Sequence, residues 1–91
     1  MIEVTRTDAG DPLGFDVRVE DGHGASSHAV TMSRAQHARL AERHPPEAVV
    51  EAVFRFLLDR EPKESILGRF DVSIVSRYFP EFEEKIGGYL D

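Results

Sequence analysis

The stretch 46–60, PEAVVEAVFRFLLDR, constrains the fold of this 91-residue chain more than any other feature. Glu47, Glu51, Arg55 and Asp59 recur every four residues and would form one narrow polar stripe on a helix. Apolar side chains fill nearly all the other positions, namely Val49, Val50, Val53, Phe54, Phe56, Leu57 and Leu58. Because only one stripe of such a helix tolerates water, we predict that 46–60 is the central and most buried helix.

A shorter helix is predicted before it, over 33–43. Ser33 stands at the N-cap position and Gln36 at the third helical position, a spacing that predicts a capping box. The residues HPPE at 44–47 end this helix, while Pro46 fits the first turn of the next one. Two helices therefore follow each other with a short connection.

The first third of the chain alternates apolar and polar residues, which is the period of a half-buried strand. Strands are predicted over 2–5, 15–20 and 28–32. The residues DAGDPLG form a loop between the first two strands, and DGHGASS at 21–27 forms a loop before the third. Such short connections favour an antiparallel three-stranded meander.

The sequence predicts three further helices after the long one, over 62–69, 72–79 and 81–86. Asp71 is placed to cap the second of them. The pair Gly87-Gly88 would close the last as its C-cap.

These elements together predict an α+β fold, in which a three-stranded antiparallel meander is followed by four to five helices packed on one face. A chain of 91 residues makes a single domain over 1–91. The meander would occupy 1–32 and the helical half 33–91. A chain of this size buries roughly 60–65% of the surface that its unfolded form exposes, which is enough for one modest core.

The charge balance argues against binding to nucleic acid. The net charge is −6, and the more acidic half is 46–91, so no single-sign basic face is expected. The absence of cysteine excludes disulfides, thiolate nucleophiles and cysteine-based zinc sites. No apolar run approaches the roughly 18 residues that a membrane span requires. Since no secretory signal is visible either, we expect a cytoplasmic protein without contact to membranes.

The segment 62–79 has a local likeness to a helix-turn-helix, because GRFDVS separates two apolar helices. Only Ile74 stands between Ser73 and Val75, where such a unit has about three residues that touch bases. Arg69 and Arg77 would make about two phosphate contacts, which is too few for useful binding at cellular salt. We therefore favour a structural corner and keep a DNA-associated regulator with a degenerate helix-turn-helix at 62–79 as the alternative.

The stretches LLDREPKESIL, FDVSIVSRYFPEF and HAVTM carry a resemblance to a known group of sequences. They resemble a family of small uncharacterised bacterial proteins whose C-terminal half runs approximately FLLEREPxxSIL, then FD, then YFPE. The resemblance covers roughly 15–86 and is most specific over 56–82. It implies a bacterial cytosolic protein, and it brings no activity, cofactor or catalytic residue with it.

No residue pattern points to catalysis. The chain has no Gly-x-Ser-x-Gly elbow and no serine paired to a histidine in sequence context. The loop DGHGASS lacks the phosphate-cradling pattern. The four histidines (His23, His28, His37 and His44) lack the spacing that metal ligands prefer. We therefore expect no enzyme, no metal site and no cofactor.

Two places in the sequence are candidates for binding. His28 falls on the same strand face as Val30 and Met32, where it would either donate to a backbone carbonyl or contact a ligand. The cluster RYFPEF holds three aromatic residues that would bury core surface or form a binding hot spot. Within it, Tyr78 is the residue that we expect to be exposed.

Arg60 is predicted at the C-terminal end of the long helix. It would pair with Glu61, Glu64 or the last carbonyls of that helix, or serve as a contact residue. The complete set of candidate binding residues is Arg60, Arg69, Arg77, Tyr78 and His28. The function expected from the sequence is a small soluble protein-interaction or adaptor module, whose partner is another protein or a second copy of the chain.

Overall fold

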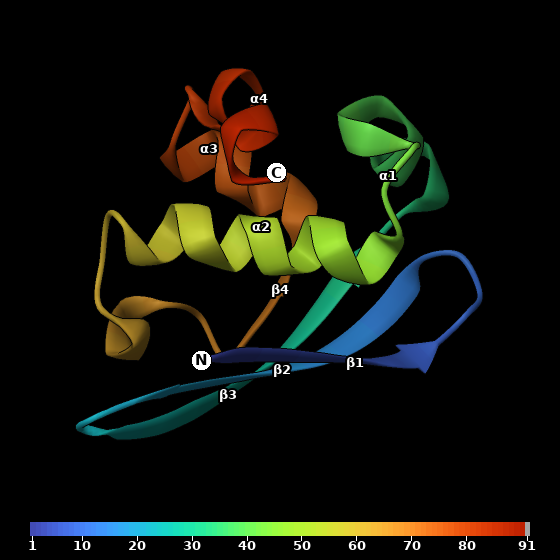
Figure 1. The fold of residues 1–91 in the computed structure, drawn as a ribbon. Helices are drawn as coiled ribbons and strands as arrows, with labels where there is room; N and C mark the ends of the chain where they lie inside the picture. The colour runs from blue at the N-terminus through green and yellow to red at the C-terminus, as the bar shows by residue number, and fades with distance from the viewer. Residues whose placement is uncertain (91) are drawn as a thin grey trace.

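The computed structural model describes residues 1–90, in which four strands form one sheet and four α-helices lie on one side of it (Figure 1). The strands are β1 (Ile2–Asp8), β2 (Leu13–Asp21), β3 (Gly24–Met32) and β4 (Arg69–Asp71). The α-helices are α1 (Arg34–Ala41), α2 (Pro46–Leu58), α3 (Val75–Tyr78) and α4 (Phe82–Lys85). Short 3-10 turns complete the chain, namely η1 (Lys63–Ser65), η2 (Val72–Ile74) and η3 (Ile86–Tyr89).

The sheet contains the predicted antiparallel meander and one strand more. The strand order is β1-β2-β3-β4, and β1, β2 and β3 pair antiparallel. β4 joins parallel to β3, with Phe70 opposite Val30. Three residues are too short to display alternation, and a parallel partner requires a long crossover, here made by α1 and α2. The prediction of three strands was therefore incomplete.

The predicted loop at 21–27 is mostly strand. β2 continues to Asp21 and β3 begins at Gly24, so that Gly22 and His23 alone form the turn. Gly24 has a φ of 131°, a backbone conformation that glycine adopts readily. The residues Ala25 to Ser27 lie near the exposed end of the hairpin, so their sequence does not alternate between apolar and polar. For this reason the sequence pattern does not predict this part of the strand.

Helix α2 is the centre of the fold, as predicted. Figure 1 shows α2 across one face of the sheet, with α1, α3 and α4 on its other side. Because it is covered from two sides, the only α2 residue that is exposed is Arg55 of the predicted polar stripe, while Glu47 and Glu51 are half-buried. Its fully buried side chains include Val49, Val50, Val53, Phe54 and Phe56.

The helix predicted over 62–69 is wrong. After Pro62 the chain makes the single turn η1 and then runs extended into β4. Pairing of Phe70 with Val30 in the sheet, together with a hydrogen bond from His28 to the Leu67 carbonyl, outweighs the local helical tendency. The two-helix unit expected at 62–79 is therefore not formed.

The helix ends follow the predictions in two cases and not in a third. The backbone N–H of Gln36 donates to Ser33 Oγ at 3.0 Å, and that of Ser73 donates to Asp71 Oδ2 at 3.0 Å, so both residues are N-caps as predicted. Within residues 1–90, no bond from the Gln36 side chain to the Ser33 N–H completes the predicted capping box. Gly87 and Gly88 do not form a C-cap, because η3 continues through them. This continuation brings Tyr89 against the Phe56 ring, with centroids 5.8 Å apart.

Candidate functional site

An open apolar groove lies where the end of α2, the segment after η1 and helix α3 meet. Its volume is about 410 Å³. Most of the residues that line it are apolar, and the full lining is Leu57, Glu61, Ser65, Ile66, Leu67, Phe70, Ile74, Val75, Tyr78 and Phe79. We refer to this surface as the groove.

Two large apolar side chains stand exposed at the groove. The exposed fraction is 49% for Leu67 and 66% for Tyr78. Tyrosine is one of the residue types enriched in protein-binding hot spots, and the exposed leucine beside it extends the apolar surface that such sites offer. Tyr78 is therefore exposed as predicted, whereas Phe82 of the same RYFPEF cluster is fully buried in the core.

The groove has a simple electrostatic character. Glu61 is the charged residue among those that line it. Within residues 1–90 its carboxylate takes part in no ion pair, whereas the nearby Glu64 is paired with Lys63. A ligand of the groove would therefore meet apolar surface with one negative charge at its side.

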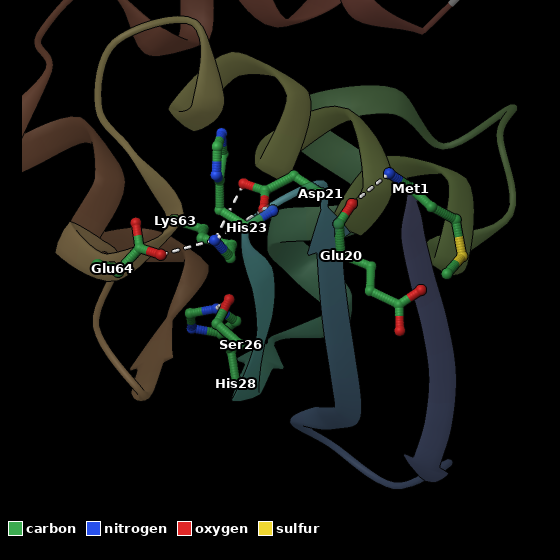
Figure 2. Close-up of polar contacts among 8 residues, drawn as sticks. All are labelled: Met1, Glu20, Asp21, His23, Ser26, His28, Lys63 and Glu64. Atoms are coloured by element: carbon green, nitrogen blue, oxygen red, sulfur yellow. Dashed lines mark hydrogen bonds and ion pairs between the residues drawn. The ribbon is translucent and has the colours of Figure 1, made fainter.

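One wall of the groove is tied to the β2–β3 hairpin by Lys63. Its side chain is 3% exposed, and Nζ lies 2.9 Å from Asp21 Oδ2 and 2.6 Å from Glu64 Oε2 (Figure 2). Hydrogen bonds to Glu64 and then Asp21 raise the pKa of Lys63 above its usual value. The same bond from Lys63 lowers the pKa of Asp21 and of Glu64. The turn that precedes Ser65 and Ile66 is thereby fixed.

His28 holds the same wall at Leu67, which follows Ser65 and Ile66 in the chain. It is buried, and its Nδ1 lies 2.7 Å from the carbonyl oxygen of Leu67. Because a carbonyl only accepts, Nδ1 carries the proton, and in the neutral ring Nε2 accepts from the Ser26 hydroxyl at 2.8 Å. The hydrogen bond to a carbonyl, one of two roles expected for His28, is present.

Ser26 and His28 correct one expectation from the sequence, which found no serine paired to a histidine. They are two residues apart on β3, so that both side chains lie on the same face of the strand. Figure 2 shows the two side chains beside each other. Neither residue lines the groove, and their bonds serve to connect β3 with the Leu67 backbone.

The opposite wall begins at Asp71. Its carboxylate accepts from the Thr31 hydroxyl at 2.6 Å, which joins β4 to β3, and from the N–H of Ser73. Burial acts to raise the pKa of Asp71, but the hydrogen bonds from Thr31 and Ser73 hold it below its usual value. These bonds set the direction in which η2 and α3 leave the sheet.

Arg60 lies at the end of α2 and contacts the C-terminal segment. Its guanidinium carbon is 3.7 Å from the centroid of the Phe56 ring, and Nε lies 3.2 Å from Glu81 Oε2. Nη1 donates to the Phe56 carbonyl at 3.1 Å, so the expected contact with the helix carbonyls is confirmed. The expected partners Glu61 and Glu64 are wrong, since the carboxylate that Arg60 contacts comes from Glu81.

The structure separates the five candidate binding residues. Tyr78 lines the groove, and His28 lies behind its wall. Arg77 is exposed beside Tyr78 on α3, while Arg69 is exposed on β4. Arg60 lies outside the groove lining and stabilises the helical half.

The sequence missed most of the groove. The sequence predicts Leu57 on the apolar face of the long helix, and it places Ile66 and Leu67 in a helix that is not formed. The signal that was available is the apolar pair in ESILG, which is followed by a glycine and so has little helical support.

Within residues 1–90, no group of three or more His, Cys, Asp or Glu side chains could hold a metal ion. None of the described helices is long and apolar enough to cross a membrane.

Comparisons with known proteins give no match, whether the chain is compared with family models, with curated proteins or with solved structures. The resemblance to the bacterial family over 15–86 therefore stays a prediction.

Proposed function

We propose that this protein is an interaction module that binds an apolar segment of a partner protein in the groove. The observation that carries the proposal is the exposure of Leu67 and Tyr78 beside a hollow of about 410 Å³. Ligand sites in proteins have volumes of roughly 300–1,000 Å³. The hollow is therefore large enough for one or two anchoring side chains of a peptide.

The walls of the groove favour binding because they are already held in place. Lys63 and His28 fix one wall, and Asp71 fixes the start of the other. A surface that is ordered before binding loses less conformational entropy when a ligand arrives. A rigid groove of this kind suits a short segment of defined sequence.

The charge of the groove indicates the chemistry of the partner. Glu61 adds one negative charge to the apolar lining, and the whole chain has a net charge of −6. We propose that the bound segment carries one or two aliphatic or aromatic anchors and a Lys or Arg that meets Glu61. Complementary charge of this kind contributes to specificity and to the rate of association.

A peptide-display selection on the whole chain tests this function. Peptides selected by the wild-type protein should combine an apolar anchor with a Lys or Arg. Tyr78→Ala and Leu67→Ser should each weaken binding by about 10-fold or more, as expected for residues of a hot spot. Recovery of peptides that bind Tyr78→Ala as tightly as wild type would contradict the proposal.

The charge is tested separately with a matched pair of variants. Glu61→Gln should weaken the selected peptides several-fold and reduce the salt dependence of binding. Glu84→Gln makes the same change of charge at an exposed position outside the groove, and it should leave affinity unchanged. Equal effects of both variants would mean that only net charge matters.

The alternative of a DNA-associated regulator loses the geometry on which it was based, because 62–69 is not helical. Titration into random duplex DNA at low salt still distinguishes the two functions. We expect this protein not to bind the duplex. Binding that weakens steeply as the salt concentration rises would instead indicate contacts to phosphates and support the DNA-associated regulator.

A further inference from the structure

The strand β1 forms one edge of the sheet, and its backbone bonds reveal which groups point outward. The N-terminal nitrogen of Met1 donates to the Glu20 carbonyl at 2.7 Å, and the N–H of Glu20 donates to the Met1 carbonyl at 2.9 Å (Figure 2). In an antiparallel ladder such doubly bonded pairs alternate with pairs that share no bond. Glu3 and Thr5 therefore bond to β2 like Met1.

It follows that Ile2, Val4 and Arg6 turn their N–H and C=O groups away from β2. Unpaired strand edges of this kind bind other strands unless they are blocked by proline, by an inward-pointing charge, by a bulge or by shortness. β1 has seven residues and contains no proline or lysine; its inward-pointing charge, Arg6, is neutralised by Glu47 of α2, and its irregularity lies near its end, between Arg6 and Asp8. The opposite edge, β4, has only three residues.

We propose that two copies of this chain associate through β1, which pairs antiparallel with β1 of the second copy. The partner is a second copy because the edge is complementary to itself. Pairing about a two-fold axis at Val4 places Ile2 opposite Arg6 of the other copy and Glu3 opposite Thr5. No like charges face each other in this arrangement, and it uses only residues before the irregularity.

The other symmetric registers are less favourable. A two-fold axis at Glu3 would place two glutamates opposite each other, and an axis at Arg6 would do the same with two arginines, which is destabilising. An axis at Thr5 requires Ile2 to pair with Asp8, which lies beyond the irregularity. An axis at Ile2 would pair only residues 1–3 of each copy. Charge, strand length and backbone geometry therefore select the register centred on Val4.

Side chains beside the edge support the same contact. Ile2 and Val4 are half-buried and pack against the core, so pairing would cover the apolar surface that they still expose. Arg6 is already bound to Glu47 of α2 at 2.7 Å, which holds its side chain in place. The surface offered to the second copy is thus well ordered.

The first experiment measures the mass of the chain by sedimentation equilibrium over a range of concentrations, without an N-terminal tag. The mass should rise from 10.2 kDa towards about twice that value. Val4→Pro removes one outward N–H and no bond to β2, and it should keep the chain monomeric. Val4→Thr has a similar shape and keeps the N–H, so it should still dimerise. A mass of 10.2 kDa at every concentration would overturn the proposal.

A cross-linking experiment remains informative if Val4→Pro fails to fold. The chain has no cysteine, so Glu3→Cys and Thr5→Cys each introduce a single thiol. In the proposed register Glu3 and Thr5 form a close pair without hydrogen bonds, with Cα atoms about 4.5 Å apart, which suits a disulfide. A mixture of the two variants should therefore cross-link several times faster than either alone. Faster cross-linking of Thr5→Cys alone would overturn the register.

Discussion

Two polar clusters hold separate parts of this molecule, and they do so in different ways. The Lys63 cluster (Asp21, Lys63 and Glu64) ties one wall of the groove to the β2–β3 hairpin. The Arg60 cluster (Phe56, Arg60, Glu81 and Tyr89) ties the C-terminal segment to the end of α2. Lys63 is nearly inaccessible, but both of its carboxylate partners are substantially exposed.

The difference shows that one region is held by ion pairs and the other mainly by aromatic packing. The Lys63 cluster consists of charges alone, so its strength depends on the protonation of its members. In the Arg60 cluster the guanidinium lies on the Phe56 ring, and the rings of Phe79, Phe82 and Tyr89 meet the same ring edge-on. Apolar packing does not depend on pH, so the regions held by the two clusters should respond differently to a change of pH.

The largest effect is expected for Phe56→Ala. This ring is fully buried and contacts three other aromatic rings as well as Arg60. Removing a buried phenylalanine costs about 3–5 kcal/mol of the free energy of unfolding, which urea denaturation measures. Phe56→Leu keeps most of the volume and should cost clearly less. A loss below about 1 kcal/mol for Phe56→Ala would show that other contacts hold the C-terminal segment.

A smaller effect, confined to the other region, is expected for Lys63→Met. The long apolar side chain preserves the packing of the lysine stem and removes the charge. Hydrogen exchange should become faster at the amides of Ile66 and Leu67, while that of α4 stays unchanged. Lys85→Met, at an exposed position, is the matched control and should alter neither segment. Faster exchange throughout the chain would contradict a local role.

The stability that Lys63→Met removes should depend on pH, and the directions of the pKa shifts in the Lys63 cluster say how. The pKa values of Asp21 and Glu64 are lowered, so their contribution is present above about pH 5 and is lost as the pH falls through the lowered values. The pKa of Lys63 is raised, so its contribution is complete below about pH 10 and is lost at higher pH. The difference in unfolding free energy between wild type and Lys63→Met should therefore shrink at both extremes. Phe56→Ala should show no such dependence.

The elements that could be predicted from the sequence are those with strong local signals. The stripe of Glu47, Glu51, Arg55 and Asp59 placed α2 correctly, and alternation located the three long strands. β4 and the groove could not be predicted in this way, because they depend on contacts between distant residues. Leu67 is held by His28, 39 positions away, and Lys63 by Asp21, 42 positions away. No local pattern encodes such pairs.

The same reason explains the error at 62–69 and the partial success with Arg60. Local propensity favoured a helix after Pro62, but strand pairing with β3 decided the conformation. For Arg60 the local part of the prediction, a bond to the last carbonyls of its helix, is confirmed. Its distant partner, Glu81, lay beyond what the neighbouring sequence could show.

The smallest effect is expected for a substitution that keeps the charge, Arg60→Lys. Lysine can still pair with Glu81, but its compact ammonium lacks the plane that lies on the Phe56 ring and the fork that reaches the Phe56 carbonyl. The urea midpoint should therefore fall, though by less than for Arg60→Ala, and the slope should stay the same. Binding of groove peptides by the folded protein should not change, because Arg60 does not line the groove. If Arg60→Lys matched the wild type while Arg60→Ala did not, the charge and not the ring contact would hold the C-terminal segment. The Arg60 cluster would then stabilise the fold through charge, as the Lys63 cluster does. Its contribution should be lost at low pH, where Glu81 becomes protonated, but not near pH 10, because the guanidinium stays charged.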